Sequence, residues 1–265
     1  MVQIVGRKGR VNMKEKLYEI PLNDAMDAKD ECPFCFVERK MEQDLMDFVL
    51  GSCASYMESD TREATDKAGF CREHQKKMFQ YGNALGNGWI LKTYYKKTIK
   101  EMKEEFQKFT PGKTSWKDRL TGKKGEEINS ISAWVAEKEK TCYICDRFNQ
   151  VYDRYIATFF HLYKKDAAFR DKLKNSKGTC LHHFADLCQG ADKYLNDKEK
   201  AEFFPMIFQV MEENMERVSA DIDWFIEKFD YLNKDADWKN SKDAVQRGMQ
   251  KIRGGYPADP VYKMK

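Results

Sequence analysis

The sequence predicts an all-α protein built as a duplicated helical repeat, with two three-helix units packed together and a Cys3His metal site in each. Three observations predict this class. Apolar residues recur at three- and four-residue steps over long stretches, as in amphipathic helices. No stretch alternates apolar and polar residues over a length that needs a sheet. The cysteines fall in CxxC and CxxH motifs that occur twice, in the same order and at nearly equal separation.

The composition excludes several classes of protein. Hydrophobic residues make up 42% of the 265 positions, enough for a core in one large or two modest domains, and charged residues make up 34%. These values exclude a disordered chain and indicate exposed helices. The low counts of 6 prolines and 15 glycines argue against a turn-rich β architecture. The net charge of +4 is small for this length, so charge alone does not indicate nucleic acid.

Nothing in the sequence indicates a membrane span or an export signal. No apolar run approaches the ~18 residues that a membrane helix needs. No apolar run follows the basic residues near the N-terminus, so we expect no secretion signal. Eight cysteines without an export signal favour metal ligands or reduced thiols over disulfides. We therefore expect a cytoplasmic protein without a membrane partner.

Changes in composition predict the domain boundaries. The first residues are basic and lack periodicity, so we expect a leader that is disordered or the product of an early start codon, with Met13 as the true start. A stretch with one proline, three glycines and several lysines separates the two repeats and is the best linker candidate. The expected organisation is a leader over 1–12, a first repeat over 13–109, a linker over 110–127, a second repeat over 128–253 and a tail over 254–265.

Within the first repeat, the apolar stripes and breaking residues predict a helix after each motif and a return helix. Polar residues between the motifs predict a connection with at most one helical turn. The expected elements are an extended lead-in over Lys14–Pro21, a short helix from Asn23 to Lys29, a helix from the first CxxC to about Tyr56, a connection over 58–67, a helix after Cys71 and a return helix from about Trp89 to Phe109.

The second repeat follows the same plan, with an extra helix at each end and a short helix between the two motifs. The expected elements are a helix from Ile128, a helix out of Cys142–Cys145 to about Phe159, a short helix over Ala167–Leu173 capped by Asp166, a helix after Cys180, a long return helix capped by Asp197 that reaches about Tyr231, and a last helix from Ser241 to Arg253.

The cysteine and histidine motifs predict two metal ions. A structural zinc site takes four ligands in a tetrahedron, commonly three cysteines and one histidine. A CxxC pair at a helix start places two sulfurs on one side of the first turn, where free N–H groups and the helix dipole stabilise thiolates. A CxxH motif supplies two more ligands at positions i and i+3. The expected sites are Cys32, Cys35, Cys71 and His74 in the first repeat, and Cys142, Cys145, Cys180 and His183 in the second.

Aligning the repeats separates ligands from other candidates. Glycine, cysteine and histidine stay in step when His183 matches His74, so His182 is expected to be exposed or to support the site from outside. The alignment leaves Cys53 and Cys188 opposite aromatic residues, which indicates small buried hydrophobes. His161 matches a glycine and is expected to be structural. Only the eight motif residues are therefore predicted ligands.

Zinc is the expected metal, because the ligand spacing is finger-like rather than ferredoxin-like. Iron or an iron–sulfur cluster is the alternative for the same residues. A redox dithiol at Cys32–Cys35 is a second alternative, but it needs a βαβ setting that the sequence does not predict. The common phosphate-binding, metalloprotease and hydrolase motifs are absent. Four protein ligands leave no open position for catalysis, so we favour a non-catalytic role.

A charged aromatic segment follows in the long return helix. Asp223-Trp224-Phe225 and Lys228 to Tyr231 place aromatic residues among charges. We favour a helix that closes over the core of the repeat. A surface for a partner protein or for nucleic acid is the alternative, although the interleaved acidic residues argue against a phosphate track.

The motifs together resemble an uncharacterised bacterial family that is described only as a domain of unknown function and found largely in anaerobes. The resemblance covers nearly everything from Met13 to about Arg253 and departs at residues 1–12. The family brings no established activity, so the resemblance supports the ligand frame and adds no chemistry. It rests on Met13-Lys14-Glu15-Lys16, Ile20-Pro21, the Cys32–Cys35 pair, Gly69-Phe70-Cys71 with His74, Cys142 to Arg147, Cys180 to Phe184, Asp223-Trp224-Phe225 and Lys228-Phe229-Asp230-Tyr231.

The leading functional hypothesis is a zinc-binding, non-catalytic cytoplasmic scaffold or adaptor that interacts with another macromolecule. A protein is the expected partner, and nucleic acid is the weaker alternative. The competing class is a redox, iron–sulfur or other metal-cofactor enzyme that uses the same cysteines.

Overall fold

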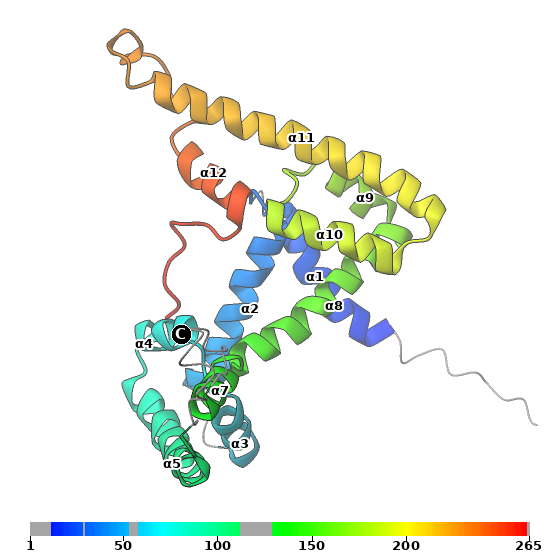
Figure 1. Ribbon diagram of the computed structural model, residues 1–265. Coiled ribbons are helices and arrows are strands. Elements are labelled where there is room, and N and C mark those ends of the chain that lie inside the picture. The colour runs from blue at the N-terminus through cyan, green and yellow to red at the C-terminus, as the bar shows by residue number, and fades with distance from the viewer. Residues whose placement is uncertain (1–11, 29, 53–57, 112–128, 264–265) are drawn as a thin grey trace, which may run out of the picture. The chain divides into compact units, whose positions relative to one another are not determined.

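The structure is a computed structural model, and it describes residues 12–28, 30–52, 58–111 and 129–263 (Figure 1). Every regular element within these ranges is a helix, which confirms the all-α class. The elements are α1 (Asn12–Asp27), α2 (Pro33–Leu50), α3 (Ser59–Ala68), α4 (Arg72–Tyr81), α5 (Ala84–Lys108), α7 (Ser130–Glu139), α8 (Tyr143–Lys165), α9 (Ala167–Lys174), α10 (Leu181–Tyr194), α11 (Asp197–Glu227), the 3-10 turn η2 (Tyr231–Asn233) and α12 (Ala244–Arg253).

The chain divides into two compact units. Unit 1 holds the described residues of 1–41 and 150–260, and unit 2 holds those of 42–149 and 261–265. The divisions fall inside α2 and α8, so each of these helices contributes residues to both units. Each unit therefore takes its CxxC motif from one sequence repeat and its CxxH motif from the other. Most of the expected leader and linker lies outside the described residues.

Unit 1 has an aromatic core. The ring of Phe159 lies 5.2 Å from that of Phe160 and 5.4 Å from that of Phe169, both in edge contact. Phe160 in turn contacts Phe203 of α11 at 5.6 Å. Large rings that meet edge to face contribute stability beyond the area they bury. This core brings α8, α9 and α11 together, and α12 packs against α10 and α11.

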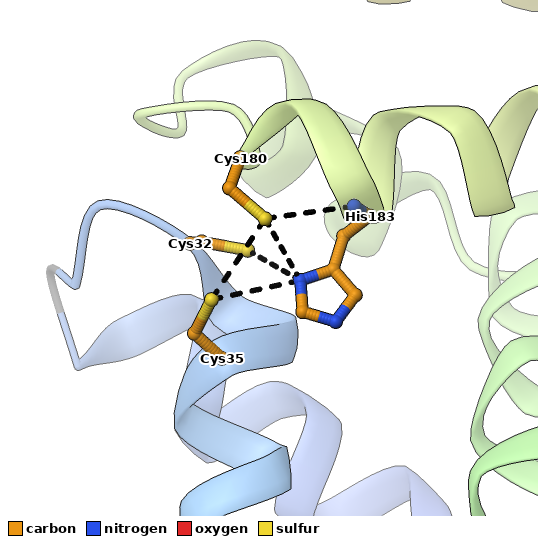
Figure 2. A group of neighbouring side chains, drawn as sticks. All are labelled: Cys32, Cys35, Cys180 and His183. Atoms are coloured by element: carbon orange, nitrogen blue, oxygen red, sulfur yellow. Dashed lines mark hydrogen bonds between the residues drawn. The ribbon is translucent and has the colours of Figure 1, made fainter. Parts of the chain in front are cut away.

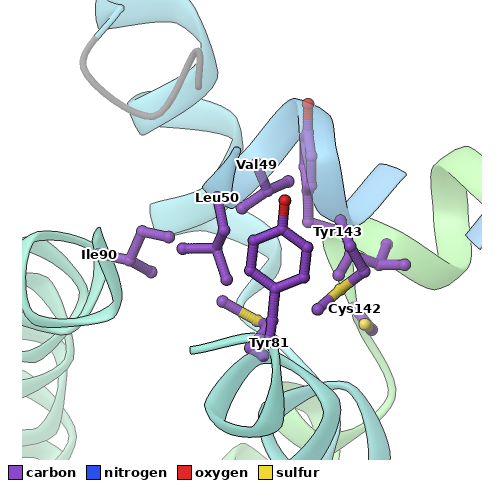
Figure 3. Close-up of a cluster of buried hydrophobic side chains, with 9 residues drawn as sticks. Val49, Leu50, Tyr81, Ile90, Cys142 and Tyr143 are labelled. Carbon is purple, nitrogen blue, oxygen red and sulfur yellow. The ribbon is translucent and has the colours of Figure 1, made fainter. Parts of the chain in front are cut away.

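Unit 2 has a smaller aliphatic core, in which Tyr81 lies near Leu50 and Ile90 (Figure 3). The predicted ligand Cys142 and its neighbour Tyr143 belong to the same buried cluster. The core therefore packs directly against the start of α8, where a CxxC motif lies. Its buried members are Met46, Val49, Leu50, Met78, Tyr81, Ile90, Cys142, Tyr143 and Ile144.

Two elements of the first repeat differ from the sequence prediction. The expected extended lead-in is part of α1, which contains Pro21. A proline disfavours helix at the residue before it, but Leu22 and Ala25 of the same helix are buried, and packing outweighs the local preference. The expected connection over 58–67 is a full helix, α3, whose Thr61 and Thr65 are buried.

Two helix boundaries of the second repeat also differ. Asn196, not Asp197, caps α11, because its side chain accepts from the N–H of Glu199 while the Glu199 carboxylate accepts from the N–H of Asn196. This reciprocal pair is a capping box. The last helix begins at Ala244 rather than at Ser241, whose hydroxyl donates to the Trp238 carbonyl in the preceding turn.

None of the described helices is both long enough and apolar enough to cross a membrane.

Candidate metal centres

Four helices begin on the first cysteine of a motif. Cys71 and Cys180 are the N-cap residues of α4 and α10. The carbonyls of Cys32 and Cys142 accept the first helical hydrogen bonds of α2 and α8. The second ligand of each motif follows three residues later, so all eight predicted ligands lie in a first helical turn. Unpaired N–H groups and the positive end of the helix dipole favour thiolates there.

Centre 1 joins Cys32 and Cys35 to Cys180 and His183 (Figure 2), and all four residues are buried. His183 Nδ1 lies 3.2 Å from the sulfur of Cys32, 3.6 Å from that of Cys35 and 3.1 Å from that of Cys180. The sulfurs of Cys35 and Cys180 are 3.9 Å apart. A tetrahedral zinc with ordinary bond lengths places sulfur and nitrogen ~3.5 Å apart and two sulfurs ~3.8 Å apart. The four atoms therefore have the spacing of ligands around one ion.

Centre 2 joins Cys71 and His74 to Cys142 and Cys145. His74 Nδ1 lies 3.2 Å from the sulfur of Cys71 and 3.3 Å from the sulfurs of Cys142 and Cys145. The sulfurs of Cys71 and Cys145 are 3.9 Å apart. These distances also fit one tetrahedral ion. Unlike centre 1, this centre has two half-buried ligands, Cys71 and Cys145.

The predicted pairing of the motifs within each repeat is wrong. Each centre combines the CxxC motif of one repeat with the CxxH motif of the other. The 18 residues of α2, which begin just after Cys32, lead the chain about 27 Å along the helix axis. The Cys71 motif follows that far end and belongs to unit 2 together with the second half of α2. The start of α2 instead meets the start of α10.

All eight predicted ligands take part in the two centres, and the other candidates do not. His183 is fully buried against the sulfurs of centre 1, whereas the side chain of His182 is 65% exposed. Cys188 is half-buried and contributes to neither cysteine centre, and the same holds for His161. Cys53 lies outside the described residues.

Each ligand histidine has a carboxylate at its other ring nitrogen. His74 Nε2 lies 3.0 Å from Glu42 Oε1, in hydrogen-bond geometry. His183 Nε2 lies 3.1 Å from Glu38 Oε1, in an ion-pair contact that is not aligned as a hydrogen bond. A carboxylate there keeps the ring proton on Nε2 and leaves the Nδ1 lone pair for a metal. Sequence reasoning missed both glutamates, because they sit at different distances from the motifs and share no pattern.

Hydrogen bonds within centre 2 shift the pKa values of three of its groups. Burial lowers the pKa of His74, but hydrogen bonds to Cys142 and Glu42 raise this pKa to about 10. Burial raises the pKa of Cys142, but the hydrogen bond from His74 lowers this pKa to about 6. The pKa of Glu42 falls to about 2 against its burial, because His74, Lys77 and Tyr262 donate to it. These shifts favour a thiolate at Cys142 and a proton on His74, which a metal cation would displace on binding.

Centre 1 has the same electrostatic pattern. Burial lowers the pKa of His183, but the hydrogen bonds with Cys180 and Cys35 and the contact with Glu38 raise this pKa to about 12. Hydrogen bonds from Cys32 and Cys35 hold the pKa of the Cys180 thiol far below its usual range. A buried cluster that stabilises thiolate in this way suits a divalent cation.

The segment expected to be a tail contributes to both centres. In unit 1 the N–H of Gly255 donates to the sulfur of Cys35 at 3.3 Å. The preceding Gly254 has a positive φ of 79°, and a Cβ there would lie 3.4 Å from the sulfur of Cys180. In unit 2 the hydroxyl of Tyr262 donates to Glu42 Oε2 at 2.7 Å. No motif in the sequence marks these residues.

Lys251 of α12 ties together the two chain segments that enter centre 1. Its side chain is 1% exposed, and Nζ donates to the carbonyl of Glu31 at 2.6 Å. The same Nζ donates to the carbonyls of Lys177 and, at 3.5 Å, of Thr179. Glu31 precedes the predicted ligand Cys32, and Thr179 precedes the predicted ligand Cys180. One buried ammonium group therefore positions both ligand-bearing segments.

At centre 2 the two entering segments bond to each other directly. The N–H of Tyr143 donates to the Gly69 carbonyl at 2.9 Å. The hydroxyl of Thr141 donates to the Ala68 carbonyl at 2.8 Å. The two centres thus have the same ligand types, but the segments that carry the ligands are held by a lysine side chain at centre 1 and by direct hydrogen bonds at centre 2.

We expect Glu42→Gln to weaken metal binding at centre 2 by about 10- to 100-fold, the usual effect of removing a carboxylate that holds a ligand histidine. The amide keeps the size of the side chain but no longer fixes the His74 tautomer with a negative charge. Competition with a chromophoric chelator measures the affinity. Glu73→Gln changes an exposed neighbour of His74 and is the matched control. Equal affinities of the two variants would contradict the assigned role of Glu42.

The fold and the two centres define an all-α protein with twin Cys3His clusters, each of which can hold a metal ion. The chain belongs to the Family of unknown function (DUF6062), whose sequence profile matches residues 13–259. That range includes all eight cluster residues and both supporting glutamates. Neither the search of curated proteins nor the search of solved structures found a match.

Proposed function

We propose that the protein is a zinc-binding, non-catalytic scaffold or adaptor that works in the cytoplasm and binds another protein. The observation that supports a structural metal is the closed ligand set of each centre. Three sulfurs and one nitrogen lie within 4.8 Å of one another, at the spacing of one tetrahedral ion. A catalytic zinc keeps a position for water or substrate, whereas four protein ligands fill the tetrahedron.

Zinc is preferred to iron because three thiolates and one imidazole at helix starts are a common structural zinc set. Metal analysis of protein purified without chelator tests the choice. We expect about two zinc ions per colourless chain, from the two four-ligand sets. A brown protein with visible absorption would instead identify iron or an iron–sulfur cluster, and a protein without bound metal would contradict both.

One observation favours the competing redox function. Cys71 and Cys145 of centre 2 are half-buried, and their sulfurs lie 3.9 Å apart. Thiol labelling separates the two functions. If zinc is structural, we expect all six ligand cysteines to resist labelling in the native protein. During chelation, Cys71 and Cys145 should then react before the buried cysteines of centre 1. Native labelling of Cys71 and Cys145 with reversible redox cycling would instead support the enzyme.

The hairpin loop over 228–239, which follows α11, supports a protein partner. Hydrogen bonds hold this hairpin in place although apolar residues are exposed on it. Lys228 Nζ donates to the carbonyls of Asn233, Lys234 and Ala236, at 2.6, 3.0 and 2.6 Å. Trp224 Nε1 donates to the Asp237 carbonyl at 2.9 Å. These bonds fix the loop before any partner binds, which lowers the entropic cost of association.

The α11 tip, defined as Phe229, Tyr231 and Leu232, is exposed to 73%, 78% and 73%. The expectation that this segment closes over the core is therefore wrong for these three residues. The residues that face inward, such as Trp224 and Phe225, hold the hairpin rather than a repeat core. Rigid exposed aromatic groups are typical of binding hot spots.

The charges around the α11 tip favour a protein over nucleic acid. Asp230, Asp235 and Asp237 are exposed there, together with Lys234 and Lys239. Three carboxylates among two ammonium groups repel a phosphate backbone. A protein surface with an apolar pocket and mixed charges fits this patch better.

We expect the double variant Phe229→Asp, Tyr231→Asp to lose the partner that the wild-type protein captures from a source-cell lysate. Quantitative mass spectrometry of the captured proteins measures the loss. Phe79→Asp is the matched control, because Phe79 of α4 is an 83% exposed aromatic residue elsewhere. Capture that is unchanged in the double variant but lost in the control would place the partner site elsewhere.

A further inference from the structure

An apolar groove lies between α11 and α12 in unit 1. It encloses ≈ 740 Å³, and its walls are almost entirely apolar. Met215, Val218 and Ile222 line it from α11, and Val245, Met249 and Ile252 line it from α12. The α11 residues recur at three- and four-residue steps, so they form one stripe of the helix.

Several apolar side chains of this groove are exposed to solvent. Met249 is 55% exposed and Ile252 is 48% exposed. Ile226 lies four residues after Ile222, continues the α11 stripe and is 63% exposed. A contiguous exposed apolar surface of this kind marks an interaction site. A site for a small molecule would add several convergent polar groups. Here Nζ of Lys251 is already bound to backbone carbonyls, and Ser219 and Arg253 are the other polar side chains among the lining residues.

The lip of the groove on α11 is acidic. The four positions follow one another at steps of four, seven and four residues, so they form one row beside the apolar stripe. All four are exposed, and within the described parts of the chain none has an ion-pair partner. The row consists of Glu212, Glu216, Asp223 and Glu227.

The lip on α12 is basic. Lys242 precedes the helix, Arg253 ends it, and both are exposed. Neither forms an ion pair with another described residue. Arg247 nearby pairs with Asp221 at 2.8 Å and with Asp243 at 2.8 Å, which leaves one carboxylate in excess against the two cations Lys242 and Arg253. The groove therefore has one net acidic lip and one net basic lip.

We propose that this groove binds the same groove of a second copy of the chain in a two-fold symmetric dimer. A two-fold axis along the groove places the acidic lip of each copy over the basic lip of the other. It also brings the two apolar stripes face to face. Such an isologous contact is closed and needs only one self-complementary patch. A second copy of the chain therefore offers this groove an apolar surface, an acidic lip and a basic lip in one contact.

Sedimentation velocity of the metal-loaded full chain over a concentration series tests the proposal. We expect the wild type to dimerise, and Met249→Glu with Ile252→Glu to raise the dimer dissociation constant about 30-fold or more, as for the loss of hot-spot residues. Both side chains are about half exposed, so the fold should persist, which circular dichroism and metal content check. Phe79→Glu, an exposed apolar position in unit 2, is the control and should dimerise like the wild type.

Charge reversal on the two lips is an independent test of the dimer, because it leaves the apolar walls of the groove unchanged. We expect Glu216→Lys with Asp223→Lys to weaken the dimer, and Arg253→Glu with Lys242→Glu to weaken it as well. The four changes together should restore it, because each reversed lip again meets the opposite charge. A wild-type protein that stays monomeric at every concentration would overturn the proposal. A dimer that neither set of groove variants weakens would also overturn it.

Discussion

In the variant Cys180→Ser, we expect Cys32 and Cys35 to become reactive toward a thiol reagent while Cys142 and Cys145 stay protected. This result follows from the cross-pairing of the motifs. Cys180 shares centre 1 with the Cys32–Cys35 pair, and Cys35 precedes it by 145 residues in the sequence. The serine removes one thiolate and leaves centre 1 with three ligands. Peptide mapping after labelling of the native protein reports which cysteines have been released.

The same variant should lose one of its two metal ions and much of its stability. Binding free energy at a structural zinc site is also folding free energy, and it reaches roughly 10–16 kcal/mol in small zinc domains. We therefore expect the free energy of unfolding of unit 1 to fall by about 5 kcal/mol or more. Native mass spectrometry and denaturant titration measure the two effects.

Cys188→Ser is the matched control, because Cys188 lies on the same helix, α10, outside both centres. It should keep two metal ions and lose no more than about 1 kcal/mol, as is usual for a partly exposed position. Release of Cys142 and Cys145 by Cys180→Ser would show that the motifs pair within each repeat after all.

The second large effect is expected for Lys251→Met, which keeps the length of the side chain and removes its charge. Glu31, which is 2% exposed, would lose one of its cationic neighbours, since Lys251 Nζ lies 3.4 Å from its carboxylate. The carbonyls before Cys32 and Cys180 would lose their shared donor. Because Glu31 keeps Arg217 at 2.5 Å, no uncompensated charge remains. We therefore expect a cost of about 1–3 kcal/mol from buried acceptors left without their donor, which denaturant unfolding measures.

Metal retention then shows whether Lys251 positions centre 1. We expect Lys251→Met to lose metal from centre 1 to a competing chelator at least about tenfold more readily, as for other groups that orient metal ligands. Centre 2 should be unaffected. Lys193→Met changes an exposed lysine of α10 and should behave like the wild type. Equal loss of metal from both centres of Lys251→Met would mean a general destabilisation and would contradict a positioning role.

Much of the fold could be predicted from the sequence, because it depends on local patterns. The step of three and four residues between apolar positions identifies the long helices such as α8 and α11. The helix caps could be predicted only in part, because Asn196 and Asp197 can both cap α11 and only the reciprocal bond with Glu199 selects Asn196. The α1 helix through Pro21 was missed, because burial of Leu22 and Ala25 outweighs a local preference.

The supporting groups of the centres could not be predicted. Glu38 and Glu42 lie four residues apart on α2, yet they approach different histidines. Gly255 and Tyr262 reach their partners from the end of the chain, and Lys251 reaches backbone carbonyls rather than a motif. Each contact joins residues far apart in the sequence, without a fixed spacing that a pattern could reveal.

The sequence by itself determined which eight residues gather in the two centres. It also determined that the two residues of each CxxC or CxxH motif lie in a first helical turn, because positions i and i+3 share a face of any helix. Only the tertiary structure decided which pairs meet. The two repeats have nearly equal spacing, so either pairing satisfies the local geometry. The packing of helix starts, which brings Cys35 and Cys180 together across 145 residues, selects one of them.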